Sequence, residues 1–194
     1  YAVIMKEMVE KNGVYIYFPK NIKKNQNIRF IGEDIKKGER VFKKGDELDF
    51  SGLSILSSLG IEHVKVFCKP KISYFSSGDE LVATGKKLQQ GQIYDSNRYL
   101  LHGLLEDLPV VFSDLGIVKD KKLHLVRKLQ RASEKSDIII TTGGVSVGDA
   151  DYIKDALSEV GSVGFWKIAI KPGRPLAFGK INDSYFFGLP GNPV

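Results

Sequence analysis

The pattern of apolar and polar positions changes once along the chain, near Lys69-Pro70. Before this point, short apolar runs are separated by tight-turn signals, among them Asn12-Gly13, a pair typical of β-hairpins. We therefore predict a smaller β-rich region over residues 1–68. Its expected elements are a hairpin of strands 2–9 and 14–18, a helix over 49–59 that begins at Asp49 or Ser51 and ends at Gly60, and a strand over 61–67.

After this point, strand-like and helix-like segments alternate. The run Ile138–Thr142 is continuously β-branched, as expected of a strand that is buried on both faces. Such alternation is typical of an α/β fold, a mostly parallel sheet with helices on both faces, and we assign residues 69–194 to a domain of this kind. The expected strands are 72–75, 110–112, 138–142, 165–170 and 185–189, and the expected helices are 97–107 (capped by Asp95 or Ser96), 120–134 (capped by Asp120) and 151–160.

Composition excludes several classes of function. The 194 residues carry a net charge of +6, and this excess is spread evenly over the chain without a basic stripe, so we expect no nucleic-acid partner. No apolar run approaches the roughly 20 residues that cross a bilayer, so we expect no membrane partner. The single cysteine, Cys68, excludes an internal disulfide scaffold and suits a reducing, cytoplasmic compartment.

A glycine-rich loop follows the run 138–142 and carries the candidate chemistry. Ligands of open parallel sheets bind beyond the carboxyl ends of the strands. The pair Gly143-Gly144 permits a sharp turn, and its N–H groups, the Ser146 hydroxyl and the next helix N-terminus would together bind an anion. The loop is neither a Walker loop nor a G-x-G-x-x-G motif, and a purely structural turn remains the alternative.

Acidic residues follow several of the expected strands. Glu80, Asp120 and Asp151 would share one rim of the sheet, although helix capping explains each of them singly. Asp149 and Asp151 would repel a phosphate in the neighbouring loop unless a cation lay between them. Carboxylate together with phosphate is the usual way to hold Mg²⁺, so we predict a magnesium site at Asp149 and Asp151.

Two lysines offer a second anion site. Lys167 and Lys171 share one face of the expected strand and would converge on one anion only if the chain bends, which Pro172-Gly173 permits. The alternative is an exposed sheet edge protected by lysines.

Several segments together resemble the molybdopterin molybdenumtransferase family, which includes MoeA and the E domain of gephyrin. Residues 142–152 resemble the signature loop of molybdopterin-binding proteins, and residues 26–38 with 59–61 resemble the region that precedes this domain. Single-domain molybdopterin adenylyltransferases share the loop but lack that region. Ser77 stands where the family pattern has threonine. The accompanying motifs are matched by residues 77–81, 91–97, 165–175 and 188–193.

The resemblance implies a role in molybdenum cofactor biosynthesis. The implied reaction is the Mg²⁺-dependent insertion of molybdate into adenylylated molybdopterin with release of AMP, the substrate coming from molybdopterin adenylyltransferase. Asp151, Glu80 and Asp120 are then the catalytic candidates, and Lys167 and Lys171 bind molybdate. The candidates for binding molybdopterin and its phosphate are Thr142, Gly143, Gly144, Ser146, Gly148, Pro190, Gly191, Asn192 and Pro193.

The resemblance also implies that the chain is part of a longer protein. The family has a further segment before residue 1 and a β-rich domain after Val194, and it works as a homodimer. We therefore expect a fragment that binds molybdopterin but turns over poorly. The alternatives are a molybdopterin adenylyltransferase, a non-enzymatic scaffold like gephyrin, and a generic nucleotide-binding domain.

Overall fold

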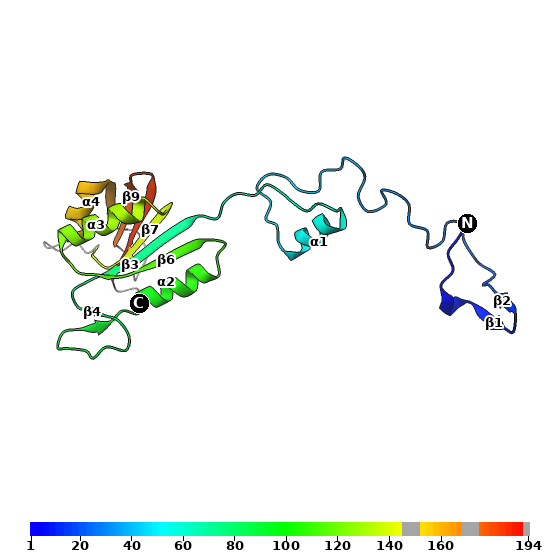
Figure 1. Cartoon of the computed structure of the whole chain (residues 1–194), viewed down its shortest axis with the longest axis horizontal. Helices are drawn as coiled ribbons and strands as arrows, with labels where there is room; N and C mark the ends of the chain where they lie inside the picture. The colour runs from blue at the N-terminus through cyan, green and yellow to red at the C-terminus, as the bar shows by residue number, and fades with distance from the viewer. Residues whose placement is uncertain (145–151, 168–174, 192–194) are drawn as a thin grey trace. The chain divides into compact units, whose positions relative to one another are not determined.

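The computed structural model describes residues 1–144, 152–167 and 175–191, without the side chains of residues 165–167. The chain divides into two compact units, residues 1–65 and residues 66–194. Both are drawn in Figure 1, and each is described separately.

The first unit begins with the hairpin that Asn12-Gly13 predicts. Strands β1 (Glu10–Asn12) and β2 (Tyr15–Tyr17) pair antiparallel, and Gly13 takes a φ of 59° in the turn between them. The prediction of a strand over residues 2–9 is wrong, because a short 3₁₀ helix, η1 (Lys6–Met8), occupies part of that segment. The hairpin around Asn12-Gly13 is therefore confirmed, but its first strand lies at residues 10–12, outside the predicted segment 2–9, and its second strand, 15–17, is shorter than the predicted 14–18.

One helix, α1 (Phe50–Ser58), completes the first unit. Asp49 is its N-cap as predicted, since Asp49 Oδ1 accepts a hydrogen bond from the Gly52 N–H at 2.8 Å. The predicted strand over residues 61–67 is wrong, because this stretch pairs with no strand in the described part of the chain. Its apolar side chains, such as those of Ile61 and Val66, are exposed.

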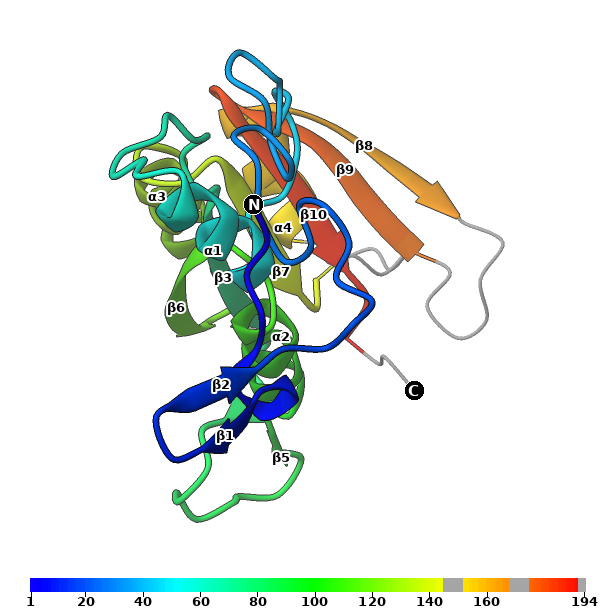
Figure 2. The ribbon, with the colours of Figure 1, turned by 90° about the vertical axis from the view of Figure 1, so that its right-hand side faces the viewer.

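A six-stranded sheet forms the second unit, in the order β6-β3-β7-β10-β9-β8. The first four strands in that order run parallel, and β9 and β8 pair antiparallel at one end. Figure 2 shows β10, β9 and β8 side by side. The prediction of a mostly parallel sheet is therefore confirmed. The bounds are β3 (Lys71–Ser77), β6 (Val111–Val118), β7 (Ile138–Thr142), β8 (Ser162–Lys167), β9 (Pro175–Ile181) and β10 (Ser184–Leu189), and β4 (Leu81–Val82) with β5 (Ile93–Tyr94) forms a separate pair.

Helices cover both faces of this sheet, as predicted (Figure 1). On one face, Leu105 of α2 (Asn97–Glu106) packs in a cluster with Ile72 and Tyr74. On the other face, α3 (Lys122–Ser133) and α4 (Tyr152–Val160) bury their apolar sides against Phe75 and Phe186. Within the described residues, no helix combines the length and the apolar character that crossing a membrane requires.

Two strand predictions and one cap prediction need correction, and one strand was missed. Strand β6 continues to Val118 rather than ending at residue 112, because it pairs along β3 in spite of the polar Ser113-Asp114. Strand β8 begins earlier than predicted, and β9 was not predicted. Asp120 does not cap α3, since Lys121 holds the N-cap position and the Asp120 N–H instead donates to Asp79 Oδ1 at 3.3 Å.

Tyr74 makes the second unit less stable at alkaline pH. Its side chain is buried, and its hydroxyl lies 2.9 Å from His102 Nδ1. Burial raises the pKa of Tyr74, and the negative charge of Asp114 raises it further. The fold therefore favours the neutral phenol. This stabilisation is complete below the unfolded pKa of about 10 and is lost as the pH rises through the higher folded pKa.

We expect the Tyr74→Phe variant to lose less stability than the unaltered chain between about pH 9 and about pH 11, because it has no phenol to ionise. Urea unfolding over this range measures the difference. Tyr152→Phe, at an exposed tyrosine, is the control and should follow the unaltered chain. Parallel curves for all three proteins would show that Tyr74 does not contribute.

Candidate functional site

The carboxyl ends of the four parallel strands are joined to one another by backbone hydrogen bonds. The Gly143 N–H donates to Leu189 O at 3.1 Å, which ties the end of β7 to the end of β10. The Gly78 N–H donates to Val118 O at 3.2 Å, which ties the end of β3 to the end of β6. These ends form one continuous edge, where ligands of open parallel sheets bind.

The glycine pair after β7 fits against the end of β3 without space for side chains. Gly143 and Gly144 have φ values of +85° and +65°, which L-residues with side chains rarely adopt. A Cβ atom on Gly143 would lie 2.4 Å from Ser77 O, and one on Gly144 would lie 2.9 Å from Ser77 Oγ. The structure therefore brings the predicted turn against the segment 77–80, as the sequence led us to expect.

Ser77 carries an unpaired hydroxyl at this contact. Its side chain is buried, and its Oγ atom has no hydrogen-bond partner within the described residues. An unsatisfied buried hydroxyl costs about 1–3 kcal/mol, so its persistence needs a reason. A ligand oxygen beside Gly144 would supply the missing partner. Ser77 was not predicted as a site residue, although it belongs to the segment 77–81 that resembles a family motif.

Three buried side chains next to the glycine turn form a hydrogen-bonded chain that supports it. Thr142 Oγ1 lies 2.9 Å from Ser76 Oγ, and Ser76 Oγ donates to Asp95 Oδ1 at 3.0 Å. Since the Ser76 proton is used toward Asp95, Thr142 must donate to Ser76. Asp95 Oδ1 also accepts a hydrogen bond from the backbone N–H of Arg98 at 3.2 Å, which fixes the carboxylate at the start of α2. We call Thr142, Ser76 and Asp95 the relay.

Sequence reasoning missed the relay. It considered Asp95 only as a helix cap, and its bond to the Arg98 N–H is of that kind. The second carboxylate oxygen lies 3.7 Å from Arg98 Nε, an ion pair without hydrogen-bond geometry. The sequence signal that would have revealed the relay is a hydroxyl-bearing residue near the end of each of two neighbouring strands. These residues are Ser76 in β3 and Thr142 in β7.

The loop after β10 reaches the same edge. Gly191 lies against Gly143, since a Cβ atom on Gly191 would come within 3.4 Å of Gly143 Cα. Asn97 Nδ2 donates to Gly191 O at 2.8 Å, which brings the first turn of α2 to this loop. The predicted residues Pro190 and Gly191 therefore join Thr142, Gly143 and Gly144 in one place.

The described acidic candidates lie after the strands that the sequence indicated. Glu80 follows β3, and its carboxylate lies over Gly78, where an added Cβ atom would be 2.6 Å from Oε2. Asp120 follows β6 and meets Asp79 through its backbone. Carboxylate oxygens suit Mg²⁺, but no three metal-ligating side chains cluster within residues 1–144, 152–167 and 175–191. The magnesium site therefore stays a prediction.

The lysine candidates are only partly described. Lys167 is the last residue of β8 and stands opposite Pro175 of β9. Because β8 runs in the same direction as β10, its end belongs to the carboxyl edge. However, β8 is also one of the two edge strands of the sheet. Both alternatives for Lys167, molybdate ligand or edge protection, thus stay open. Ser146, Gly148, Asp149, Asp151, Lys171, Asn192 and Pro193 lie outside the described residues.

Family models match both parts of the chain. The model described as "Probable molybdopterin binding domain" matches residues 75–194. The model described as "MoeA N-terminal region (domain I and II)" matches residues 1–60. Together they account for most of the sequence.

Curated relatives carry consistent names. The chain is 50% identical over 194 residues to the molybdopterin molybdenumtransferase of Haemophilus influenzae, a match that covers 100% of this chain and 48% of the relative. It is 36% identical to the enzyme of that name from Staphylococcus aureus, covering 99% and 46%. It is 37% identical to gephyrin of Dictyostelium discoideum, covering 97% and 30%. The chain thus spans about half the length, or less, of these relatives.

Solved structures agree with this pattern. The molybdopterin biosynthesis protein MoeA from Pyrococcus horikosii matches with a TM-score of 0.77 and 36% identity, covering 99% of this chain and 48% of that one. MoaB from Thermus thermophilus matches with a TM-score of 0.50 and 16% identity, covering 64% and 82%, which shows the fold alone.

Proposed function

This chain belongs to the MoeA-type family of molybdopterin molybdenumtransferases, and on that premise we propose that it is the molybdopterin-binding part of such an enzyme. The observation that carries the proposal is the contact, at the carboxyl edge, between Gly143-Gly144 and the Ser77 hydroxyl, which has no partner among the described residues. The proposed reaction is the insertion of molybdate into adenylylated molybdopterin with release of AMP. The chain spans about half of its relatives, so it would supply one part of the complete active site.

Molybdopterin would bind through its phosphate at the glycine turn. The Gly143 N–H already donates to Leu189 O, so Gly144 offers the backbone donor in the described part of the turn. The Ser77 hydroxyl lies beside it and suits a phosphate oxygen. We propose that Ser146 and Gly148 belong to the same site. Thr142 and residues 190–193 would complete it, and of these Gly191 lies against Gly143.

Molybdate and the acidic residues would lie on the same edge. We assign Lys167 and Lys171 to molybdate, because a tetrahedral oxyanion is held by fixed cations. Glu80, Asp120 and Asp151 are assigned to catalysis, in which a carboxylate orients the water that attacks the adenylate. Asp149 and Asp151 would hold Mg²⁺, which when bound neutralises phosphate charge.

The remaining parts of the proposal concern the protein in its setting. The family resemblance favours a homodimer and an upstream molybdopterin adenylyltransferase that supplies the substrate. The lone Cys68 suits a reducing compartment, and we propose the cytoplasm. A chain of this length is expected to bind molybdopterin but to turn over poorly.

Two other functions compete with this one. The adenylyltransferase reaction would use the same turn, but the match of residues 1–60 to the MoeA N-terminal region favours the molybdenumtransferase. Adenylylation of molybdopterin by ATP without any need for molybdate would favour the rival. The similarity to gephyrin is the observation that favours a scaffold role as the second alternative. Capture of a receptor peptide without molybdopterin binding would favour that role.

Titration of the chain with molybdopterin under anaerobic conditions tests the proposal. We expect saturable binding that Ser146→Ala weakens about tenfold or more, because a hydrogen bond to a charged phosphate oxygen is worth about 1.5–3 kcal/mol. The matched control is Ser158→Ala on α4, where the hydroxyl donates to its own helix at Asp155 O, and binding should not change.

Asp151→Ala in the full-length enzyme separates binding from catalysis. This variant should keep its affinity for adenylylated molybdopterin and lose adenylate cleavage. The absence of saturable binding to the unaltered chain, or equal losses in the two serine variants, would refute the proposed site.

A further inference from the structure

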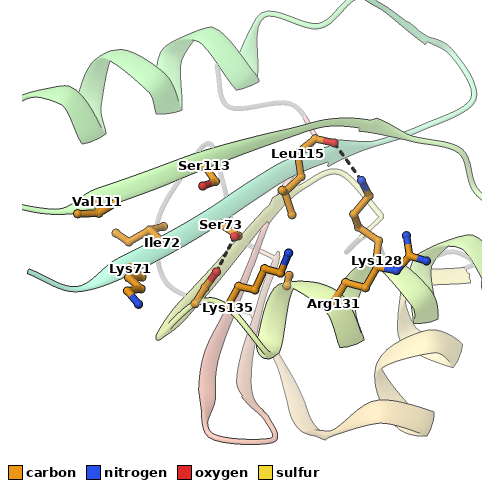
Figure 3. Close-up of a pocket in the computed structure, with 11 residues that line it drawn as sticks. Lys71, Ile72, Ser73, Val111, Ser113, Leu115, Lys128, Arg131 and Lys135 are labelled. Carbon is orange, nitrogen blue, oxygen red and sulfur yellow. Dashed lines mark hydrogen bonds between the residues drawn. The ribbon is translucent and has the colours of Figure 1, made fainter.

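A pocket of about 370 Å³ lies between strands β3 and β6 and helix α3 (Figure 3). It exists because small residues face one another there. Ser73 of β3 stands opposite Ser113 of β6, and Ala132 faces them from α3. Elsewhere in this layer, Phe75 and Leu129 fill the corresponding space. The hollow is therefore a consequence of the sequence.

This pocket is separate from the molybdopterin site. Its lining includes the first residues of two strands, Lys71 of β3 and Val111 of β6, and Ser136 shortly before β7. The glycine turn follows the opposite, carboxyl end of β7. An occupant of the pocket would therefore bind independently of molybdopterin.

All ionisable side chains that line the pocket are cationic. They belong to Lys71, Lys128, Arg131 and Lys135, and no carboxylate is among the described residues that line the pocket. Within the described part of the chain, none of the four forms a salt bridge. Four unpaired cations around one hollow repel each other, and an anion between them would relieve that repulsion.

The lining groups are arranged to donate hydrogen bonds. Lys128 Nζ donates to Leu115 O at 3.2 Å, which fixes the ammonium and leaves two of its N–H donors. Figure 3 shows the amino ends of Lys128 and Lys135 pointing toward the surface of β3 and β6. The hydroxyl of Ser113 adds a further donor. The hydroxyls of Ser73 and Ser136 share one hydrogen bond, so one of their two protons can be donated to another acceptor.

The helix dipole alone does not explain this arrangement. Cations near the C-terminus of α3 are favoured there, which accounts for Arg131 on an open surface. It does not account for two serines on neighbouring strands: Ser73 of β3, which is buried where apolar side chains are the rule, and Ser113 of the edge strand β6, which is exposed. Cations on the helix side of the pocket and hydroxyls on the strand side together form the donor set of a phosphate site.

We propose that this pocket binds a small phosphomonoester, with Arg131 and Lys135 pairing with the phosphate and the serine hydroxyls completing its shell. A dianionic, tetrahedral group satisfies more of these donors than a carboxylate does. The volume lies at the lower end of the range for small-molecule sites, which limits the organic part to a few carbon atoms or a small ring.

The test is a titration of the full chain, without molybdopterin, followed by amide shifts in NMR spectra at constant ionic strength. The probes are glycerol 3-phosphate and inorganic phosphate. We expect saturable shifts at Ser73, Ser113 and Arg131 with both probes, and tighter binding of glycerol 3-phosphate if the pocket recognises the organic part. Equal affinities would assign the site to the phosphate group alone, which keeps the shared chemistry but overturns the monoester preference.

Matched variants on α3 locate the site. Arg131→Gln removes a lining cation, and we expect it to weaken binding about tenfold. Arg127→Gln removes the same charge from an exposed position of the same helix outside the lining, and it should leave binding unchanged. Lys135→Gln, beyond the end of the helix, repeats the test without altering α3.

Three results would overturn the inference. They are shifts that do not saturate, equal weakening by Arg127→Gln and Arg131→Gln, and shifts confined to Ser77 and Gly144. The last would place the phosphate at the carboxyl edge and support the proposed function instead, so the two proposals fail separately.

Discussion

Replacing Gly143 by alanine is expected to weaken molybdopterin binding more than a hundredfold and to destabilise the second unit. The new Cβ would lie 2.4 Å from Ser77 O, a backbone atom of β3 that cannot rotate away. A positive φ costs a residue with a side chain about 1–2 kcal/mol, and overpacking adds about 1–3 kcal/mol. Relief of the clash requires the turn to move away from β3, which separates Gly144 from Ser77 and dismantles the phosphate site.

Gly85→Ala is the matched control for this prediction. Gly85 has a φ of +84°, against +85° for Gly143, but no atom of the described residues lies within 4 Å of its added Cβ. It should therefore lose only the conformational part, about 1–2 kcal/mol of unfolding free energy, and keep its affinity for molybdopterin. Urea unfolding and molybdopterin titration measure both quantities. Equal behaviour of the two variants would show that the contact with Ser77 has no functional weight.

The sequence predicted the parts of the fold that depend on local pattern. The β-branched run of β7 and the apolar sides of α3 and α4 are visible in any short window, and these elements were found. Strand β9 was missed because it contains Pro175 and Gly179, residue types that are typical of loops. The predicted strand over 61–67 failed for the opposite reason, since its residues favour a strand but pair with no other strand in the described chain.

The candidate site was predictable only as far as topology determines it. Parallel strands bring their carboxyl ends together, so the sequence could place Gly144 and Glu80 on one edge. It could not assign the Gly143 N–H to Leu189 O, because that depends on the pairing of β7 with β10. The relay was invisible for the same reason. Its two hydrogen bonds join residues that are 19 and 66 positions apart.

Replacing Asp95 by alanine is expected to lower the free energy of unfolding by about 3–4 kcal/mol, because it removes a buried, charged acceptor. The Ser76 hydroxyl would lose its acceptor, and Arg98 would lose one of its two carboxylate partners while keeping Asp114, at 3.4 Å. Molybdopterin affinity should fall as well, about tenfold, since Thr142 donates to Ser76 and directly precedes the glycine turn. Urea unfolding and molybdopterin titration again give the two readouts.

Asp114→Ala and Asp95→Asn distinguish the relay from a simple ion pair. Asp114 shares Arg98 with Asp95, but its side chain is 37% exposed, so its loss should cost about 1 kcal/mol and leave affinity unchanged. The Asp95→Asn change would remove the charge facing Arg98 while keeping an oxygen for Ser76, so affinity should be retained although stability falls. If affinity instead follows the charge, falling in Asp95→Asn as far as in Asp95→Ala, then the electrostatic partner of Arg98 supports the turn. The hydrogen-bonded path through Ser76 to Thr142 would then have no part in binding.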